Sequence, residues 1–277
     1  MMAAATQAAE VFAYRTAIDL AEAALALGHP DAIDLHAMIG RARTRSGDYA
    51  GAVAAFELAA AWATPAQLPA IEWEIARARL RQGDLAAADR HLATVVDGAL
   101  TSPAVRARAW VDRSTIRRRN GEVNGAIEAA RSALAVATDA GDSSAVGAAR
   151  RMLGLCALDA DDPKTAIGEL TSAVQAARSD PDPSSRVGAL VGLAMATAAA
   201  GDVETAVAHG ADAAAECRRI GDRHLEAAVE NHLADILHQA GREEDSRDHL
   251  RLAVAAFAEV GGDPADPDPG IWMLSAS

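Results

Sequence analysis

A two-residue corner recurs along the chain at nearly constant spacing, and this repetition limits what the chain can fold into. Glycine takes a positive φ at little cost and so can end a helix, and an aspartate behind it can cap the next helix. Successive corners lie 36, 38, 40, 40 and 40 residues apart. They are Gly47-Asp48, Gly83-Asp84, Gly121-Glu122, Asp161-Asp162, Gly201-Asp202 and Gly241-Arg242. Such a period is typical of repeat proteins, and it predicts six helix hairpins.

The segments on both sides of each corner have the composition of helices. Alanine, the residue with the highest helix propensity, makes up about a quarter of the chain. Aromatic residues, which strands favour, make up only 3%. The predicted first helix (helix A) and second helix (helix B) of the hairpins span about 31–46 and 48–62, 69–82 and 85–96, 102–120 and 123–139, 142–159 and 163–178, 185–200 and 203–220, and 222–240 and 243–260. We therefore expect an all-α solenoid of antiparallel helix hairpins.

Residues at fixed distances from the corners indicate how the two helices of a hairpin pack. Seven residues before each corner stand Gly40, Ala76, Ser114, Gly154, Ala194 and Ala234. Small side chains there let the two helices cross closely. Nine residues after each corner stand Phe56, Leu92, Ala130, Leu170, Gly210 and Leu250, which mostly supply large apolar contacts. Two misfits, Gly210 and Arg113 (at an otherwise apolar position), are expected to weaken their hairpins locally.

The two ends of the chain depart from the repeat. Residues from about Ala4 to Leu27 have the pattern of a single helix, interpreted as an N-terminal capping helix or half repeat within residues 1–30. The six hairpins occupy 31–262. Residues 263–277 form a tail with three prolines and three aspartates, expected to be extended, that ends in an apolar segment. We expect Trp272 of that segment to cover the exposed face of the last helix pair.

The best-matched hairpin resembles a tetratricopeptide repeat. Ile39-Gly40, Gly47-Asp48-Tyr49, Ala52, Phe56 and Ala59 match the family pattern, and Trp110 occupies the tryptophan position of that pattern in the third hairpin. The resemblance implies a right-handed superhelix with helix A on the concave side. Because the repeats exceed the usual 34 residues of the family, the array looks like the C-terminal regions of bacterial signalling ATPases, cyclase-like proteins and large transcription activators. Arg41 stands where the chaperone-binding members have asparagine, which disfavours a chaperone tail as ligand.

No pattern for catalysis or for a cofactor stands out, and we expect a protein that is not an enzyme. Phosphate-loop and nucleophile-elbow motifs are absent from the sequence. The best metal candidate, His232-x-x-Asp235-x-x-His238, drifts around its helix, so solvated side chains are the preferred interpretation. Cys156 and Cys217 show no metal-type spacing and are expected to be buried and reduced.

The charge and hydropathy of the chain limit which partners and which cellular location are expected. The net charge is −13. Residues 1–138 balance 15 arginines against 15 acidic residues, whereas 139–277 carry 11 basic and 24 acidic residues. Direct binding to nucleic acid is therefore not expected. The sequence predicts neither a signal peptide nor a membrane helix, and a cytoplasmic location is expected.

Arginines on the predicted helices A form the candidate binding site. Together with one tryptophan, these residues are expected on the face that the family resemblance assigns to the groove: Arg41, Arg45, Trp73, Arg77, Arg81, Arg118, Arg119 and Arg151. They could bind a protein or peptide, especially an acidic one, through charge-assisted hydrogen bonds. Alternatively, the arginines form salt bridges with neighbours such as Glu74, Asp34 or Asp112.

These observations favour a non-catalytic protein-interaction scaffold. The family resemblance suggests the regulatory C-terminal module of a larger bacterial signalling or transcription-control protein. One alternative is a small-ligand sensor whose solenoid changes curvature on binding. Another is a self-assembling homo-oligomer, in which the acidic second half of one copy meets the arginines of another.

Overall fold

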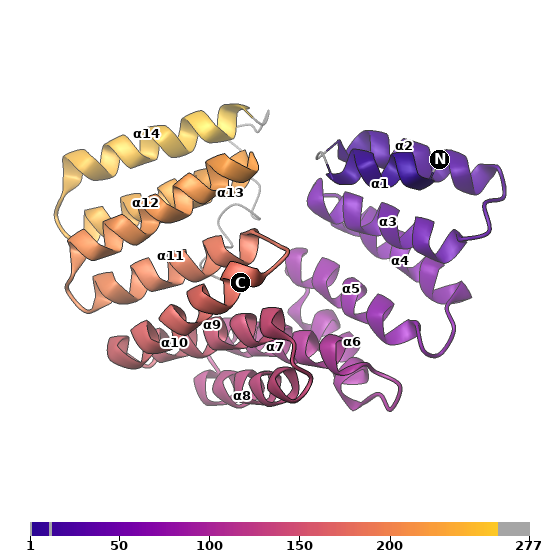
Figure 1. The fold of residues 1–277 in the computed structure, drawn as a ribbon, viewed down its shortest axis with the longest axis horizontal. Helices are drawn as coiled ribbons and strands as arrows, with labels where there is room; N and C mark the ends of the chain where they lie inside the picture. The colour runs from indigo at the N-terminus through magenta and orange to yellow at the C-terminus, as the bar shows by residue number, and fades with distance from the viewer. Residues whose placement is uncertain (1, 11–12, 260–277) are drawn as a thin grey trace. The chain divides into compact units, whose positions relative to one another are not determined.

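A computed structural model describes residues 2–10 and 13–259 of the 277-residue chain. Within these residues the secondary structure is entirely helical, with fourteen α-helices, one short 3-10 helix and no strand (Figure 1). The predicted all-α array of helix hairpins is confirmed. The chain divides into two compact units, Met1–Ile116 and Arg117–Ser277.

The first unit contains the helices up to most of α7. They are α1 (Met2–Glu10), α2 (Tyr14–Ala26), α3 (Ala32–Arg45), α4 (Tyr49–Trp62), α5 (Leu68–Arg81), α6 (Leu85–Asp97) and α7 (Pro103–Arg119), of which the last three residues belong to the second unit. The second unit then contains α8 (Val123–Asp139), α9 (Ser143–Asp159), α10 (Pro163–Ala176), η1 (Ala177–Ser179), α11 (Ser184–Ala199), α12 (Val203–Ile220), α13 (Arg223–Gln239) and α14 (Glu243–Glu259). The bounds predicted for the twelve hairpin helices agree with these to within about two residues.

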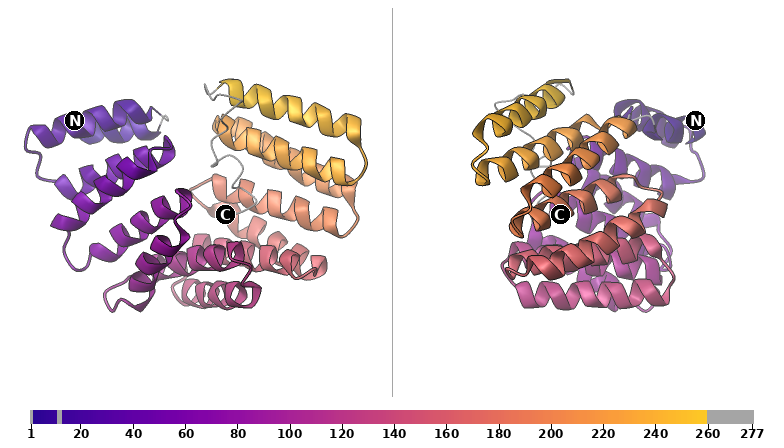
Figure 2. Two further views of the ribbon diagram at one scale, coloured as in Figure 1. Left: turned by 180° about the vertical axis from the view of Figure 1, so that it is seen from behind. Right: turned by 60° about the vertical axis from the view of Figure 1, so that its left-hand side comes forward.

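Each unit is built from two layers of helices. Consecutive helices pack against each other, from α1 to α6 in the first unit and from α8 to α14 in the second (Figure 2). The odd-numbered helices also contact one another, as α1 with α3, α3 with α5, α9 with α11, and α11 with α13. Helices A therefore form one continuous layer in each unit. Side chains on the face of this layer that points away from helices B therefore lie close to those of the neighbouring hairpin.

The corners have the backbone conformation that the sequence predicts. Gly47 has φ 82°, Gly83 has φ 84°, and Asp161, which replaces glycine at the fourth corner, has φ 57°. Behind Gly47, the Asp48 carboxylate accepts a hydrogen bond from the Gly51 N–H at 2.9 Å. The corners thus both end helix A and cap helix B, which fixes the hairpin geometry locally.

The caps at two later corners also shift the pKa of the capping carboxyl group. The Thr205 hydroxyl and then its backbone N–H donate to Asp202, and these hydrogen bonds lower the pKa of this exposed carboxyl. Thr165 lowers the pKa of Asp162 in the same way. Each carboxylate is therefore bound more tightly in its charged form than in its neutral form.

Glycine seven residues before a corner is required by the packing. A Cβ atom added at Gly40 would lie 2.6 Å from the ring of Phe56, and one added at Gly154 would lie 2.5 Å from Leu170. Phe56 and Leu170 are both fully buried. The close crossing that the sequence predicts is therefore present in these hairpins.

Gly210 and Arg113, which were expected to weaken their hairpins, both have packing or polar partners in the structure. The structure therefore gives no reason for local weakness at these two positions. The space that a Cβ on Gly210 would need is filled by Leu233, whose Cδ2 lies 2.3 Å from that position. Arg113 Nε donates to Asp89 Oδ1 at 2.8 Å, and its guanidinium lies 5.2 Å from the Trp110 ring centroid. In each case a residue of another helix makes up for the missing apolar contact. The sequence of one repeat does not reveal which residue that is.

The prediction of one helix from Ala4 to Leu27 is wrong. The structure has two helices there, α1 and α2, which pack against each other. Ala5 and Ala21 are fully buried in a cluster that also contains Leu35 of α3. The break lets a second alanine face be buried, which a single continuous helix could not do. No glycine or proline marks this break in the sequence.

The predicted tail 263–277 with Trp272 lies outside the described residues. The division of the chain into 1–30, 31–262 and 263–277 stays a prediction.

Candidate functional site

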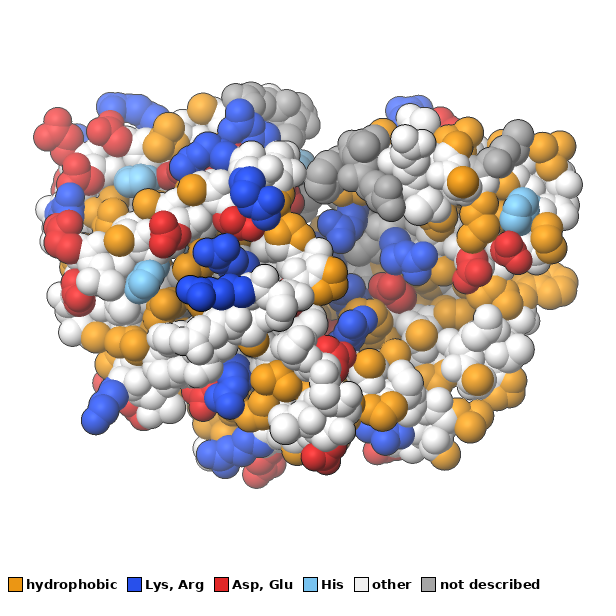
Figure 3. Space-filling model, in the orientation of Figure 1, with side chains coloured by type: hydrophobic (Ala, Val, Ile, Leu, Met, Phe, Trp, Pro, Cys, Tyr) orange, Lys and Arg blue, Asp and Glu red, His pale blue; other side chains and the backbone are white. Residues whose placement is uncertain are grey.

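Helices α3 and α5 carry five of the eight predicted site residues. Arg41 and Arg45 are one turn apart on α3, and Trp73, Arg77 and Arg81 follow one another at single turns on α5. The two helices contact each other. Figure 3 shows arginine side chains gathered over α3 and α5 with a few carboxylates among them. We call Arg41, Arg45, Trp73, Arg77 and Arg81 the arginine face.

Glu74 joins two arginines of this face. Its Oε1 lies 3.8 Å from Arg41 Nη1, and its Oε2 lies 3.8 Å from Arg77 Nη1. The salt bridge considered from sequence for Glu74 is therefore present, whereas Asp34 makes no ion pair among the described residues. Arg41 keeps 52% of its side chain exposed. The Glu74 side chain is 18% exposed, but both arginines that it faces are exposed, and ion pairs of exposed arginines at this separation contribute about 0–1 kcal/mol. Glu74 therefore leaves both guanidinium groups able to bind another anion.

Trp73 interacts with two guanidinium groups. Arg77 lies 4.8 Å and Arg108 lies 5.5 Å from the ring centroid. The indole Nε1–H donates to Asp112 Oδ2 at 2.7 Å. Arg108 and Asp112 stand one turn apart on α7, so the next helix A extends the site. Sequence reasoning missed Arg108, although its four-residue spacing from Asp112 could have shown that the two share a face.

Arg81 lies in the most crowded part of the arginine face. Burial lowers its pKa most, the positive charges of Arg77 and Arg45 lower it further, and a hydrogen bond with Tyr49 opposes these effects. The side chain as a whole is exposed to solvent, so protein atoms surround the guanidinium group without closing it off. Among the described residues, neither Arg45 nor Arg81 has a carboxylate within ion-pair distance. An anion bound here would relieve the repulsion between these like charges.

The other three predicted residues lie in the second unit. Arg118 Nη1 is 3.3 Å from both Asp159 Oδ1 and Oδ2, and its side chain is only 12% exposed. Arg119 and Arg151 are half-buried. For Arg118 the structure therefore favours the salt-bridge interpretation over binding.

A second row of arginines, four residues before the corners, connects neighbouring hairpins. Arg43 Nη2 donates to Glu22 Oε1 at 3.0 Å, and its Nη1 donates to the Gly51 carbonyl at 3.2 Å. Arg79 Nη2 lies 4.0 Å from Glu57 Oε1. The contacts with Glu22 and Glu57 connect a hairpin to the preceding one, whereas the contact with Gly51 joins the two helices of one hairpin.

Polar pairs also recur inside hairpins, between the residue eleven before a corner and the residue eight after it. His91 Nδ1 is 2.6 Å from Glu72 Oε2, and Arg150 donates to Glu169 at 2.9 Å. In the last hairpin, His249 Nδ1 is 2.7 Å from Glu230 Oε2. We call these contacts the hairpin clasps. They were not predicted, because the residue types at these two positions change from one hairpin to the next.

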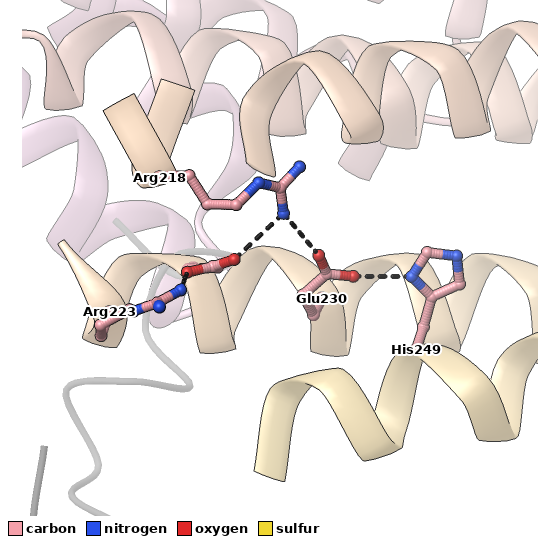
Figure 4. Close-up of polar contacts among 5 residues, drawn as sticks. Arg218, Arg223, Glu230 and His249 are labelled. Atoms are coloured by element: carbon pink, nitrogen blue, oxygen red, sulfur yellow. Dashed lines mark hydrogen bonds and ion pairs between the residues drawn. The ribbon is translucent and has the colours of Figure 1, made fainter. Parts of the chain in front are cut away.

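The clasp of the last hairpin belongs to a buried network (Figure 4). Glu230 is only 3% exposed, and Glu226 on the same helix is 5% exposed. Arg218 Nη1 lies 3.0 Å from Glu226 Oε1 and 3.5 Å from Glu230 Oε1, and Arg223 also pairs with Glu226. Arg218 of α12 thus pairs with both buried carboxylates, Arg223 of α13 with one and His249 of α14 with the other, so the network connects these three helices.

No catalytic or metal-binding arrangement emerges from the part of the chain that the structure describes. Those residues contain no group of three or more His, Cys, Asp and Glu side chains placed to hold a metal ion. Burial lowers the pKa of His232, while nearby Asp235 raises it, and His238 Nδ1 pairs with Glu243 at 2.9 Å. Burial raises the pKa of the Cys217 thiol to about 12, which makes it unreactive near neutral pH.

A surface hollow of about 500 Å³ lies apart from the arginine face. It is lined by Arg15, Ile18, Asp19, Glu22, Arg43, Ser46 and Asp48, at α2, α3 and the start of α4. Arg43 is already paired there with both Glu22 and Asp48, so this hollow offers little unpaired charge to a ligand. Within the described residues, no helix has the length and apolar character needed to cross a bilayer.

The fold is shared with known helical repeat proteins. The apo form of the quorum sensor NprR from B. thuringiensis is similar with a TM-score of 0.71 and 14% identity, over 93% of this chain and 75% of that chain. A Rap protein complexed with Competence and Sporulation Factor has a TM-score of 0.65 and 14% identity, over 83% of this chain and 70% of that one.

A third similar structure is a STAND signal-transduction ATPase with a tetratricopeptide repeat sensor, from Pyrococcus horikoshii. Its TM-score is 0.63 at 14% identity, over 95% of this chain and 44% of that protein. None of the curated protein sequences matches this chain. Residues 74–145 match the tetratricopeptide repeat family. Residues 74–145 therefore resemble tetratricopeptide repeats, and the fold of the chain is that of tetratricopeptide-repeat-like proteins.

Proposed function

We propose that this protein is a non-catalytic interaction scaffold that binds an acidic segment of a partner protein at the arginine face. The observation that carries the proposal is the convergence of guanidinium groups from three successive helices A in the first unit. They come from α3, α5 and α7, and two of them, Arg45 and Arg81, lack a carboxylate partner among the described residues.

The local charge has the opposite sign to the net charge of the protein. Arg41, Arg45, Arg77, Arg81 and Arg108 contribute five positive charges, and Glu74 and Asp112 contribute two negative ones, which leaves three in excess. The whole chain carries −13. A local positive potential on an acidic protein attracts acidic ligands and repels basic ones. Arginine also binds carboxylates with two parallel hydrogen bonds, which adds orientation to attraction.

Trp73 supplies the apolar part of the site. Its ring is half-buried and fixed by Asp112, so it loses little conformational freedom when a ligand packs on it. Aromatic and arginine side chains are the residues that dominate binding energy in protein interfaces. An acidic segment that also carries an apolar side chain would use both parts.

The comparisons agree with this proposal at the level of the fold. The similar Rap structure was determined with Competence and Sporulation Factor bound. A related structural frame can therefore accommodate a partner, while the chemistry of the present site selects an acidic one.

The test is peptide binding to the full chain, followed by fluorescence anisotropy. Acidic peptides are compared with peptides of the same length in which Asp and Glu are replaced by Asn and Gln. We expect the acidic peptides to bind more tightly, and R45E/R81E to weaken binding about tenfold or more, since hydrogen bonds to charged groups contribute about 1.5–3 kcal/mol.

R15E/R90E is the matched control, because both arginines are exposed in the same unit and the change in net charge is identical. If the control loses as much affinity as R45E/R81E, the arginine face is not the site. Equal binding of the acidic and amide peptides would also refute the proposal. If the acidic half of a second copy is the partner, the chain will associate with itself at low salt, and R45E/R81E will abolish that association.

We further propose that the chain serves as the regulatory C-terminal module of a larger bacterial signalling or transcription-control protein. The similarity to the STAND ATPase, of which the chain spans 44%, supports this proposal. A nucleotide-binding or DNA-binding domain encoded in frame upstream is expected. An immediately preceding start site without such a domain would contradict it.

A further inference from the structure

The last described helix, α14, exposes a position that is buried in the second helix of every other hairpin. The residues nine after the corner in α4, α6 and α10 are Phe56, Leu92 and Leu170, and each has 0% of its surface exposed. They pack against the helix A that follows, as Phe56 packs with Ile71 and Ile75. The residue at the same position in α14 is Leu250, which is 43% exposed.

The position one turn further along is buried in two of the other helices and partly buried in α4, α8 and α10. Val96 of α6 is 7% exposed, and Ala214 of α12 is 1% exposed in a cluster with α13. The equivalent Val254 of α14 is 56% exposed. We call Leu250 and Val254 the stacking face of α14. In a solenoid each hairpin buries its face only against its neighbour, so this face needs a cover.

Other residues of α14 pack against α13. Phe257 is buried and packs edge-on against His224, with ring centroids 6.3 Å apart. The buried Ser246 hydroxyl donates to the Ala234 carbonyl at 2.8 Å. The exposed leucine and valine are therefore not displaced core residues. They are exposed on a helix whose other residues contact α13.

The chain itself supplies a segment suited to this face. Residues 271–274 are Ile-Trp-Met-Leu, and Pro264, Pro267 and Pro269 precede them. This stretch lies outside the described residues. The twelve residues 260–271 can span up to about 40 Å. Leu250 lies only about 13.5 Å before Glu259 along the helix axis, so the apolar segment can reach it easily.

We propose that the apolar segment 271–274 packs on the stacking face of α14, with Trp272 against Leu250 and Val254. The segment then takes the place that the helix A of a seventh hairpin would occupy. The prolines prevent residues 263–269 from continuing as a helix, which lets the chain turn back along α14. The cover seals the open end of the repeat array and protects α14 from local unfolding.

The test is hydrogen exchange of the α14 amides in the full chain, compared among L250D, W272A and the double variant. Burial of a side chain of this size contributes about 1.5–3 kcal/mol, so each single variant should exchange about tenfold faster or more. The double variant should exchange no faster than the faster single variant, because both changes remove the same contact.

L252D is the matched control, since Leu252 is 52% exposed on the same helix but lies on a different face. It should leave exchange in α14 unchanged. The proposal is wrong if L250D behaves like L252D, or if the effects of L250D and W272A add. It is also wrong if L250D dissociates a dimer in sedimentation while W272A leaves α14 unchanged, because a second copy would then be the cover.

Discussion

The close helix crossing in the first hairpin makes a measurable prediction for a single methyl group. A Cβ added at Gly40 would lie 2.6 Å from Phe56 Cε1 and 2.7 Å from Cδ1 and Cζ, far inside ordinary contact distance. Phe56 has no exposed surface, and it packs with Ile71 and Ile75, which restrict its movement. Gly168, in the middle of α10, provides the comparison, because a Cβ there would meet nothing within 4 Å.

The expected effects of alanine at the two glycines differ only in steric overlap. Replacing glycine by alanine inside a helix gains about 1 kcal/mol in propensity at both positions. At Gly40 the overlap with Phe56 costs about 1–3 kcal/mol, as for other overpacked cores. We therefore expect G168A to stabilise the protein and G40A to be less stable than G168A by about 1–3 kcal/mol.

The assay is hydrogen exchange combined with urea unfolding, because a repeat array can open locally before it unfolds globally. Faster exchange in G40A should be confined to α3, α4 and the neighbouring helices. The additional change Phe56→Leu should recover part of the loss, since it removes ring atoms from the overlap. If G40A and G168A have equal stability, the crossing distance does not limit this position and the packing argument fails.

Two further predictions concern polar contacts. In double-mutant cycles with alanine, the clasp between Glu230 and His249 should show a larger coupling free energy than the clasp between Glu72 and His91. The reason is that the side chain of Glu230 is 4% exposed and that of Glu72 is 22% exposed. Equal couplings would refute the role of burial. The hydrogen bonds from the threonine three residues on lower the pKa of Asp202, so its contribution to stability is present above the ordinary value of 3.8 and is lost as the pH falls through the lower folded pKa. Acid unfolding followed by circular dichroism should therefore show a smaller loss of stability below about pH 4 in D202N than in the unchanged protein, and an identical loss would contradict this assignment.

The sequence by itself determined the hairpins, because the interactions that fix them are local. A positive φ at Gly47 and a cap at Asp48 depend on residues a few positions apart, and the same local chemistry recurs at each corner. The arginines of α3 and α5 were placed on one face for the same reason, since helical periodicity alone aligns residues four apart.

Only the tertiary structure decided which side chains meet between helices. It paired Arg118 with Asp159, forty-one residues away, and placed Arg108 of α7 over Trp73 of α5. It also let Leu233 fill the space above Gly210, and it divided the N-terminal segment into two helices. These outcomes depend on the shape and charge of a neighbouring helix, which the local pattern of a single repeat does not contain. This difference between local interactions and contacts between helices explains why the corners were predicted in detail while the environment of Arg81 was not.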